Sequence, residues 1–448
     1  MMSPHNMRPV PEAALILGEG QYYSMDCYRT QLNNNALIIG TSGAGKTRSV
    51  VRPNLLRATG SYVVSDPKGV LAKEIGPYLK SRGYRVIEMD FMHPERSLKY
   101  NPVTKVHSTE DVSRLAHMIV NEEKGRRSAA DPFWDCASKM LFCTVLGYLY
   151  ETDEYPENEK NFSLISRLIC EANEIEDGLA DKPFVPPHNI RSKLEARMER
   201  HVQTMRAKGK ESWAYHRYRE FATAPDKTYR TIIITSLAKL ITFDTEELRV
   251  MFEGNDIDFK SIGQQPTAVF VEVSDTDRSK DILVNLFYSQ LINELCGYAD
   301  DECPGNRLPV SVQFLLDDFA TNAHIDNFEN MISNIRSRGI SAMLMVQSEA
   351  QLEAGYGVHA HTIVDNCSSY VFMGGSDPAM AEIIAKKANK SPSTILNMPV
   401  GTSWIFRRGE EPVMCKNFDL PSFENEKGFV PGQPQQIVEP MEAYSRMN

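Results

Sequence analysis

The stretch "IIGTSGAGKTRSV", residues 38–50, decides the fold class of this chain. Its glycines 40 and 45, followed by Lys46 and Thr47, give the pattern G-x-x-x-x-G-K-T, and the apolar run "ALII" comes directly before it. This order predicts a buried strand, a loop and a helix, in which backbone N–H groups and the helix N-terminus face the phosphates of a nucleotide. A flexible turn is the competing interpretation, and the preceding strand favours the nucleotide site.

Each residue type in this loop has a chemical task. Glycine adopts backbone dihedrals that are closed to other residues, Lys46 neutralises the β- and γ-phosphate oxygens, and the Thr47 hydroxyl ligates Mg²⁺. We therefore expect ATP and Mg²⁺ as cofactors. The predicted nucleotide-binding loop consists of Gly40, Thr41, Ser42, Gly43, Ala44, Gly45, Lys46 and Thr47.

A second apolar run ends in two carboxylates. In "VSVQFLLDDFA" (310–320) an expected buried strand is followed by Asp317 and Asp318. Nucleotide hydrolysis requires acidic residues that face the metal and the attacking water. We expect Asp317 in the Mg²⁺ shell and Asp318 to polarise the water, with a helix cap as the competing interpretation. Gln347, which follows "SAMLMV", is expected to sense the γ-phosphate or simply to end its strand.

The same alternation extends along the chain and predicts a doubly wound α/β sheet. Amphipathic stretches at 279–298, 326–338 and 377–388 separate several of the apolar runs. Polar residues at the run ends, Asp66 and Asp90 among them, are expected at the carboxyl edge of the sheet, where ligands bind in such folds. Further expected strands cover residues 61–66, 85–91, 267–273, 340–348 and 368–375.

Composition excludes several other classes of protein. The chain has 448 residues, 42% of them hydrophobic, and a formal charge of −10, so any contact with nucleic acid must be local. We expect no transmembrane helix, because no apolar run approaches the roughly 20 residues a bilayer crossing needs, and no secretory signal. The eight cysteines are scattered without metal-ligand spacing and are expected to be reduced.

Six motifs occur in a set order and together resemble the conjugative coupling proteins of type IV secretion, the TraG/TraD-type ATPases. The resemblance spans roughly residues 12 to 420. It implies an ATPase with a RecA-like P-loop domain, built on a mainly parallel sheet and interrupted by an all-α domain. The motifs are "GTSGAGKT", "VVSDPKG" (63–69), "KYNPV" (99–103), "LLDDFA" (315–320), "IRSRGISAMLMVQSEAQLEAGYG" (335–357) and "IVDNCSSYVFMGGSD" (363–377).

Matched position by position, the resemblance implies further site residues. Asp66 and Lys68, in "SDPKG", are expected beside the nucleotide. Arg336 is expected to enter a neighbouring subunit's site as an arginine finger, with Arg338 as the alternative finger and a solvated helix end as the competing interpretation. The residues expected to act in catalysis are Lys46, Asp317, Asp318, Gln347 and Arg336.

The resemblance also implies partners and a location. Six copies are expected to form a ring when active, with a monomer in isolation. The ring is expected to carry relaxase-linked single-stranded DNA, with protein as a further candidate cargo, toward a type IV secretion channel. Members commonly have N-terminal membrane helices, so we expect either an anchor supplied by a partner or a truncated chain. The expected location is cytoplasmic, at the inner face of the cell membrane. Asp318 departs from the family pattern, which usually has Glu at this position.

Helical periodicity replaces the strand pattern between "KYNPV" and about residue 245. The segment 191–219 holds nine Lys/Arg against three Glu, with interleaved aromatic residues that could stack on unpaired bases. A solvated helix face is the competing interpretation. The candidate DNA contacts are Arg197, Arg200, Arg206, Lys208, Lys210, Trp213 and Arg217.

The predicted organisation has four parts, and two rival functions stay open. One rival is an intracellular DNA pump or helicase-like hexamer of the FtsK/HerA kind. The other is a non-motor docking platform for secretion substrates, gated by nucleotide.

The predicted parts of the chain are the first nucleotide-binding segment (1–107), the all-α domain (108–245), the second nucleotide-binding segment (246–420) and a mobile C-terminal tail (421–448).

Overall fold

The computed structural model divides into two compact units, which we call the sheet unit and the helical unit. The sheet unit comprises residues 1–92, 258–281 and 291–448, and the helical unit comprises 93–257 and 282–290. The predicted tail, 421–448, lies outside the described residues except at two positions. The described residues are 14–121, 132–175, 192–274, 276–319, 325–421 and 424.

The sheet unit is built on a nine-stranded sheet with the order β11-β10-β9-β3-β8-β7-β4-β6-β5. All strands from β9 to β5 run parallel, and β10 and β11 add an antiparallel edge. The strands are β3 (Ala36–Ile39), β4 (Ser61–Ser65), β5 (Arg85–Asp90), β6 (Thr267–Glu272), β7 (Val312–Leu316), β8 (Ile340–Val346), β9 (Ser369–Phe372), β10 (Thr402–Arg407) and β11 (Val413–Lys416). A separate hairpin pairs β1 (Ala14–Gly18) with β2 (Gln21–Ser24).

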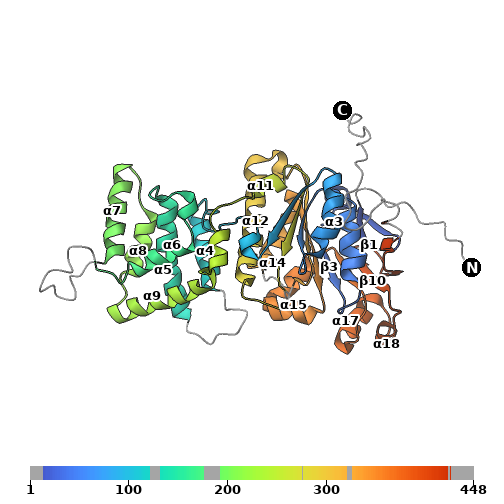
Figure 1. The fold of residues 1–448 in the computed structure, drawn as a ribbon. Coiled ribbons are helices and arrows are strands. Elements are labelled where there is room, and N and C mark those ends of the chain that lie inside the picture. The colour runs from blue at the N-terminus through green and yellow to red at the C-terminus, as the bar shows by residue number, and fades with distance from the viewer. Residues whose placement is uncertain are drawn as a thin grey trace, which may run out of the picture. The chain divides into compact units, whose positions relative to one another are not determined.

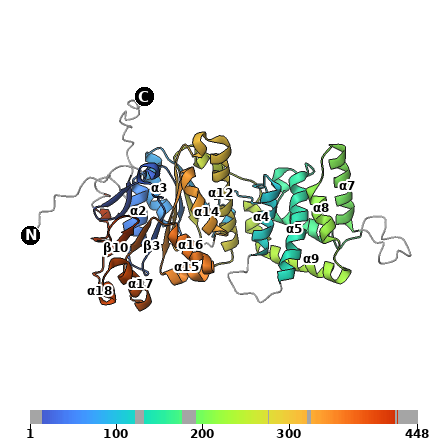
Figure 2. The same ribbon diagram turned by 180° about the vertical axis from the view of Figure 1, so that it is seen from behind.

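Helices cover both faces of this sheet. Helices α2 and α3 lie on one face together with the β1–β2 hairpin, and α12, α14 and α16 lie on the other (Figures 1 and 2). The helices of this unit are α1 (Cys27–Thr30), α2 (Arg52–Leu56), α3 (Val70–Ser81), α11 (Phe259–Ile262), α14 (Phe328–Asn334), α15 (Glu349–Tyr356), α16 (Ala360–Asp365), α17 (Pro378–Ala388) and α18 (Pro392–Leu396). Helix α12 (Asp281–Glu302) is divided between the units, with residues 282–290 in the helical unit and the rest in the sheet unit. Because both faces are covered, β3, β6, β7 and β8 are buried along their whole length.

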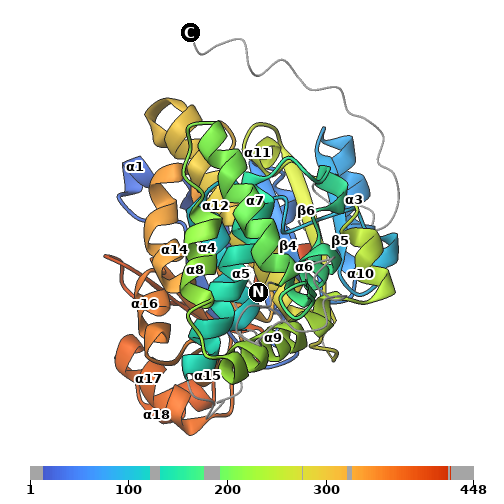
Figure 3. The same ribbon diagram turned by 90° about the vertical axis from the view of Figure 1, so that its left-hand side faces the viewer.

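The helical unit contains α-helices and short 3₁₀ turns in its described part. Helix α9 lies across the unit and contacts α4, α5 and α6, while α8 packs against α5 and α7 (Figure 3). The helices are α4 (Thr109–Val120), α5 (Pro132–Glu151), α6 (Phe162–Cys170), α7 (Lys193–Ala207), α8 (Trp213–Phe221), α9 (Asp226–Leu240) and α10 (Glu246–Met251). The unit extends beyond 108–245 at both ends, because the 3₁₀ turn Pro94–Arg96 packs against α10.

These observations confirm the predicted fold class: an α/β domain with a mainly parallel sheet, interrupted in the chain by an all-α unit. Strand β8 lies between β3 and β7, with Ile39 paired to Val346 and Leu316 paired to Leu344. The carboxyl ends of three strands that are far apart in the sequence therefore meet at one edge. This edge positions the candidate site.

Candidate nucleotide site

The glycine-rich loop between β3 and α2 has the backbone that a phosphate-binding loop requires. Gly43 and Gly45 have φ values of 80° and 89°, in the left-handed region that disfavours residues with a side chain. Gly40 is constrained by space, because a Cβ there would lie 2.9 Å from the Cβ of Ala44. Each glycine of the motif therefore has a geometric reason to be glycine.

The helix that follows the loop is hydrogen-bonded to the β1–β2 hairpin. A π-helical turn, Thr47–Val51, precedes Pro53, which lacks the N–H that an uninterrupted helix would use. The buried side chain of Asn54 accepts a hydrogen bond from the Ile16 N–H (3.1 Å) and donates one to the Ile16 carbonyl (2.8 Å). These two bonds tie the start of α2 to the β1–β2 hairpin.

The Lys46 side chain is folded into the loop itself. Its Nζ donates to the carbonyl of Gly40 at 2.7 Å and to that of Thr41 at 3.4 Å, and the residue is only 7% exposed. Hydrogen bonds to these carbonyl groups offset part of the cost of burying the ammonium, and its charge also acts on Asp317. The charge thus lies where the phosphates of a bound nucleotide would need neutralisation.

Thr47 and Asp317 are 270 positions apart in the chain and in direct contact. The Thr47 hydroxyl donates a hydrogen bond of 2.5 Å to Oδ2 of Asp317, whose side chain is almost completely buried. Burial raises the pKa of the Asp317 carboxyl, and the bond from Thr47 acts in the opposite direction. A hydroxyl and a carboxylate are oxygen ligands of the kind that Mg²⁺ takes together with phosphates and water. The pair therefore fits a magnesium ion brought by a nucleotide.

Asp318 and Gln347 lie at the same edge of the sheet. Asp318 follows Asp317 with a φ of 50°, and its N–H donates to Oδ1 of Asp317 at 3.1 Å. Gln347 is the first residue after β8, which separates β3 from β7, and is exposed. Its N–H donates to Oε1 of Gln351, which steadies the backbone there.

Asp66 has a local structural task at this edge. It follows β4, and its carboxylate accepts hydrogen bonds from the N–H groups of Val70 (3.1 Å) and Ala72 (2.9 Å), which are unpaired donors at the start of α3. Burial raises the pKa of Asp66 despite these bonds. Lys68 is exposed in the turn between β4 and α3. The "SDPKG" motif therefore begins a helix directly after β4, the strand that pairs with β7, and Asp317 follows β7.

One loop contact carries no recognisable sequence signal. Asn417, just after β11, donates through Nδ2 to the Ala44 carbonyl at 3.4 Å. Its Oδ1 accepts a bond from the Ser403 hydroxyl at 2.6 Å, and its N–H donates to the Gly401 carbonyl at 2.8 Å. The antiparallel edge of the sheet thus supports the phosphate loop. This contact could not be predicted from the sequence, because a single asparagine after a short strand matches no motif.

Arg336 and Arg338 lie at the opposite edge of the sheet. Both belong to the 3₁₀ turn Ile335–Arg338, which comes directly before β8. Strand β8 has seven residues, and a rise of about 3.3 Å per residue separates its two ends by roughly 20 Å. Within one chain, neither arginine is near Lys46.

The two arginines differ in their partners. Arg338 binds Asp300 through Nε (2.9 Å) and Nη2 (2.6 Å), an arrangement that occupies its guanidinium. Nη2 of Arg336 donates to the carbonyl of Cys27 at 2.8 Å, and no described carboxylate pairs with it. Among the described residues, Arg338 is therefore paired with a carboxylate and Arg336 is not.

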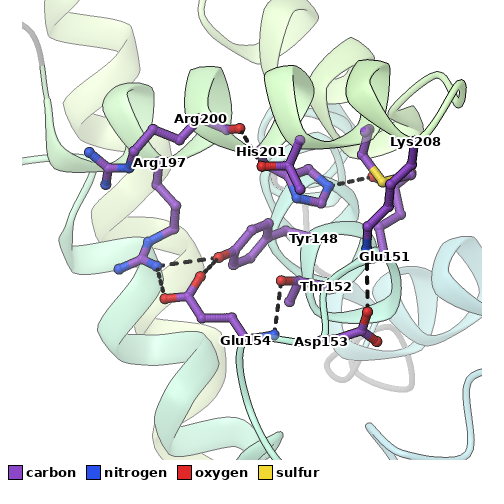
Figure 4. Close-up of a pocket in the computed structure, with 11 residues that line it drawn as sticks. Tyr148, Glu151, Thr152, Asp153, Glu154, Arg197, Arg200, His201 and Lys208 are labelled. Atoms are coloured by element: carbon purple, nitrogen blue, oxygen red, sulfur yellow. Dashed lines mark hydrogen bonds and ion pairs between the residues drawn. The ribbon is translucent and has the colours of Figure 1, made fainter.

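Arg197, a candidate DNA contact, is held within the helical unit (Figure 4). Its guanidinium donates two bonds of 2.8 Å to the carboxylate of Glu171 and one of 2.9 Å to Glu154. Tyr148 also accepts a bond from it and donates one to Glu154. The side chain is 18% exposed, so most of its donors face protein.

Trp213 and Arg217 also make contacts within the unit. A Cβ at Gly147 would lie 2.9 Å from the Trp213 ring, which shows how closely the indole packs on α5. The guanidinium of Arg217 lies 5.5 Å from the centre of that ring and pairs with Glu220 at 2.8 Å. The aromatic part of the segment is largely built into the helix packing.

The remaining candidate DNA contacts are exposed. Arg200 and Lys208 line a pocket of about 470 Å³ between α7 and the end of α5, together with His201 (Figure 4). Lys208 pairs with Asp153 at 3.5 Å. No ion pair is found for Arg206 or Lys210 among the described residues. Of the seven predicted contacts, these two have the most available charge.

Comparison with known proteins places this arrangement in context. A family model described as type IV secretory system conjugative DNA transfer matches residues 6–416. No curated protein matches the chain. Within its described residues, no helix has both the length and the apolar character needed to cross a bilayer.

Several solved structures share the fold. The conjugative coupling protein TrwB, in complex with ADP and Mg²⁺, is 16% identical, with a TM-score of 0.63, 96% of this chain covered and 92% of that chain. Its form with sulphate is 15% identical, with a TM-score of 0.63 and coverages of 92% and 90%. VirB4 of Thermoanaerobacter pseudethanolicus is 13% identical, with a TM-score of 0.51 and coverages of 93% and 98%.

Proposed function

The chain belongs to the type IV secretory system conjugative DNA transfer family, and from this premise we propose that it hydrolyses ATP to drive DNA transfer. In this proposal it links relaxase-bound DNA, in single-stranded form, to a type IV secretion channel and moves it into that channel. The active form is a homo-hexamer at the inner face of the cell membrane, and the isolated chain is a monomer.

The contact between Thr47 and Asp317 carries the proposal. It joins the phosphate loop to the acidic strand end with oxygen ligands suited to a metal, and TrwB has been seen with ADP and Mg²⁺ on the same fold. Bound Mg²⁺ would supply charge neutralisation at the phosphates. In this chain, the loop N–H groups and Lys46 bind and orient the phosphates, and Thr47 and Asp317 hold the metal.

The attacking water needs a separate group to orient it. Asp318 adjoins Asp317 at the same edge, and we assign it to accept a proton from the water. Gln347 lies at the end of the strand between the two halves of the site, and its exposed amide is assigned to contact the γ-phosphate. Catalysis then relies on positioning and charge rather than on a covalent intermediate.

The arginine finger must come from another copy of the chain. Arg336 lies at the far end of β8 from the loop and has no described carboxylate partner. In a ring, this arginine supplies positive charge to the transferring phosphoryl group of the adjacent subunit. Hydrolysis is therefore coupled to assembly.

DNA contacts in the helical unit are assigned to its exposed cations. Arg206 and Lys210 are exposed without described ion-pair partners, and Arg200 and Lys208 lie close to them in sequence. Lysine and arginine of this kind bind phosphates regardless of base sequence. The net charge of −10 means that such contacts act locally.

ATP turnover, measured with and without single-stranded DNA over a range of protein concentrations, tests the proposal. Turnover per chain is expected to rise with protein concentration, as subunits meet, and to rise further with DNA. Hydrolysis that DNA fails to stimulate at any salt concentration would favour the nucleotide-gated docking platform instead. Equal stimulation by double-stranded DNA in the absence of a relaxase would favour the intracellular DNA pump.

A further inference from the structure

A small polar cavity lies at the amino edge of the sheet, away from the phosphate loop. It has a volume of about 50 Å³ and is lined from the segments that precede four parallel strands. Thr59 comes before β4, Arg307 and Ser311 before β7, and Arg336 before β8. The fourth wall is the chain around Cys27, ahead of β3.

Two side chains in this wall have buried polar atoms without hydrogen-bond partners among the described residues. Gln313, on β7, is 3% exposed, and neither its amide nitrogen nor its amide oxygen has a partner. The hydroxyl of Thr59 is in the same condition. Buried polar groups normally have partners, so these groups indicate a polar occupant of the cavity.

Two arginines add positive charge to the same cavity. Nη1 of Arg307 donates to Sγ of Cys27 at 3.6 Å, and its guanidinium lies 5.0 Å from the centre of the Tyr28 ring. Arg336 donates to the Cys27 carbonyl at 2.8 Å. Neither arginine has an ion-pair partner among the described residues, in contrast to Arg338. None of the described residues that line the cavity is acidic.

The charged groups around the cavity favour an anion as its occupant. Asp26 acts by charge on Arg307 but does not line the cavity. Its carboxylate caps α1 through the N–H groups of Arg29 and Tyr28, and these bonds, together with the charges of Arg29 and Arg307, lower its pKa. Two guanidinium groups together with amide and hydroxyl donors match a tetrahedral phosphoryl group. The volume admits no more than the end of a larger ligand.

We propose that this cavity binds the terminal phosphate of a nucleotide held by a second copy of the chain, and that Arg307 acts there beside Arg336. The proposal rests on the proposed ATPase function and extends it to a second cation in trans. The chain's own nucleotide cannot be the occupant, because its phosphate loop lies at the other end of the strands. Free phosphate has the same chemistry and is distinguished by the test.

ATP turnover of Arg307→Gln tests the proposal. At protein concentrations where wild-type turnover per chain has reached its plateau, the variant is expected to lose about a hundredfold, as when a preorganised donor to the reacting group is removed. Its affinity for ADP at its own loop should stay unchanged. Arg85→Gln is the matched control, since Arg85 is exposed at the same edge and its side chain donates to the Ser261 hydroxyl, far from any proposed site residue.

Mixing experiments separate action in trans from a structural effect. Adding Lys46→Ala chains, which have an intact Arg307, should restore turnover to Arg307→Gln chains, which have an intact loop. Absence of restoration at every ratio, or wild-type turnover of Arg307→Gln, overturns the proposal. Arg307→Lys keeps the charge and should retain part of the turnover, and thermal unfolding of both variants should match wild type.

Two further outcomes are distinguishable. If inorganic phosphate inhibits wild type but not Arg307→Gln, the occupant is free phosphate and the assignment to a second copy is wrong. If wild type itself hydrolyses no ATP at any concentration, the proposed function fails. In that case, comparing the ADP affinities of wild type and Arg307→Gln still shows whether the cavity beside Arg307 is independent of the chain's own phosphate loop.

Discussion

The carboxyl edge of the sheet and the α7–α8 segment of the helical unit both carry dense sets of polar residues, but they use them differently. At the sheet edge, Thr47 and Asp317 meet because parallel strands end together, and their side chains remain suited to a ligand. In the helical unit, Arg197 and Arg217 bind carboxylates of their own unit. The topology of the sheet brings distant residues together into one site. In the helical segment, by contrast, some of the charged side chains form ion pairs that hold the helices together.

The largest expected effect is a loss of ATP turnover when the phosphate loop at the sheet edge is changed. Changing Lys46 to Ala removes the positive charge on the β- and γ-phosphates, and ATP turnover should fall by about a thousandfold or more. Phosphate release measures this loss. Lys80→Ala is the matched control, because Lys80 is exposed on α3, and it should keep wild-type turnover. Unimpaired hydrolysis in Lys46→Ala would mean that the loop is not the catalytic site.

A smaller effect tests whether Arg197 is structural. Arg197→Ala leaves the carboxylate of Glu171, which is 13% exposed, without its bidentate partner. The free energy of unfolding of the helical unit should fall by about 3 kcal/mol, typical of removing one partner of a largely buried pair. Denaturant unfolding measures it, and Arg206→Ala should change it by less than about 0.5 kcal/mol. Equal losses in the two variants would contradict this distinction.

Replacing the exposed cations of the same segment should weaken DNA binding and leave the stability of the helical unit almost unchanged. Arg206→Ala and Lys210→Ala are each expected to lower the slope of log affinity against log salt by about 0.7 for single-stranded DNA, as expected for one phosphate contact. Fluorescence anisotropy over a series of salt concentrations gives the slope. Glu211→Gln, which removes a nearby exposed negative charge, is the control and should leave it unchanged. A slope that does not respond in either arginine or lysine variant places the DNA elsewhere.

The smallest expected effect is a pH-dependent change in thermal stability when Asp317 is replaced. Burial raises its pKa in the folded chain, so its ionisation destabilises the fold as pH rises through that value. Without nucleotide and Mg²⁺, Asp317→Asn should therefore unfold a few degrees above wild type at pH 8. The difference should vanish below the unfolded pKa of about 3.9, where the carboxyl is protonated in both states. A pH-independent difference would mean that the effect comes from packing.

Much of the sheet could be predicted because its strands are continuous apolar runs. The runs at 36–39, 61–66 and 340–348 correspond to β3, β4 and β8, which are buried throughout. Strands β1, β2, β10 and β11 are absent from the expected strands. Strand β11 is short and alternates between exposed and half-buried residues. Antiparallel edge strands of this kind lack the continuous apolar signal.

Contacts between residues far apart in the chain limited the prediction of the sites. The pairing of Thr47 with Asp317 was expected, because each ends or follows a predicted strand. No pattern marks Glu171 as the partner of Arg197, since that pairing depends on how two helical segments pack. Arg307 lies outside every motif and becomes visible only when four strand beginnings are brought together.

The bond from Asn417 to Ala44 has a practical consequence for protein engineering. A shortened version that stops before position 417 deletes a brace of the glycine loop while leaving every motif residue in place. Weak nucleotide affinity in such a version would reflect the missing brace rather than a defect in the motif. Fusion partners and affinity tags therefore belong well beyond Asn417.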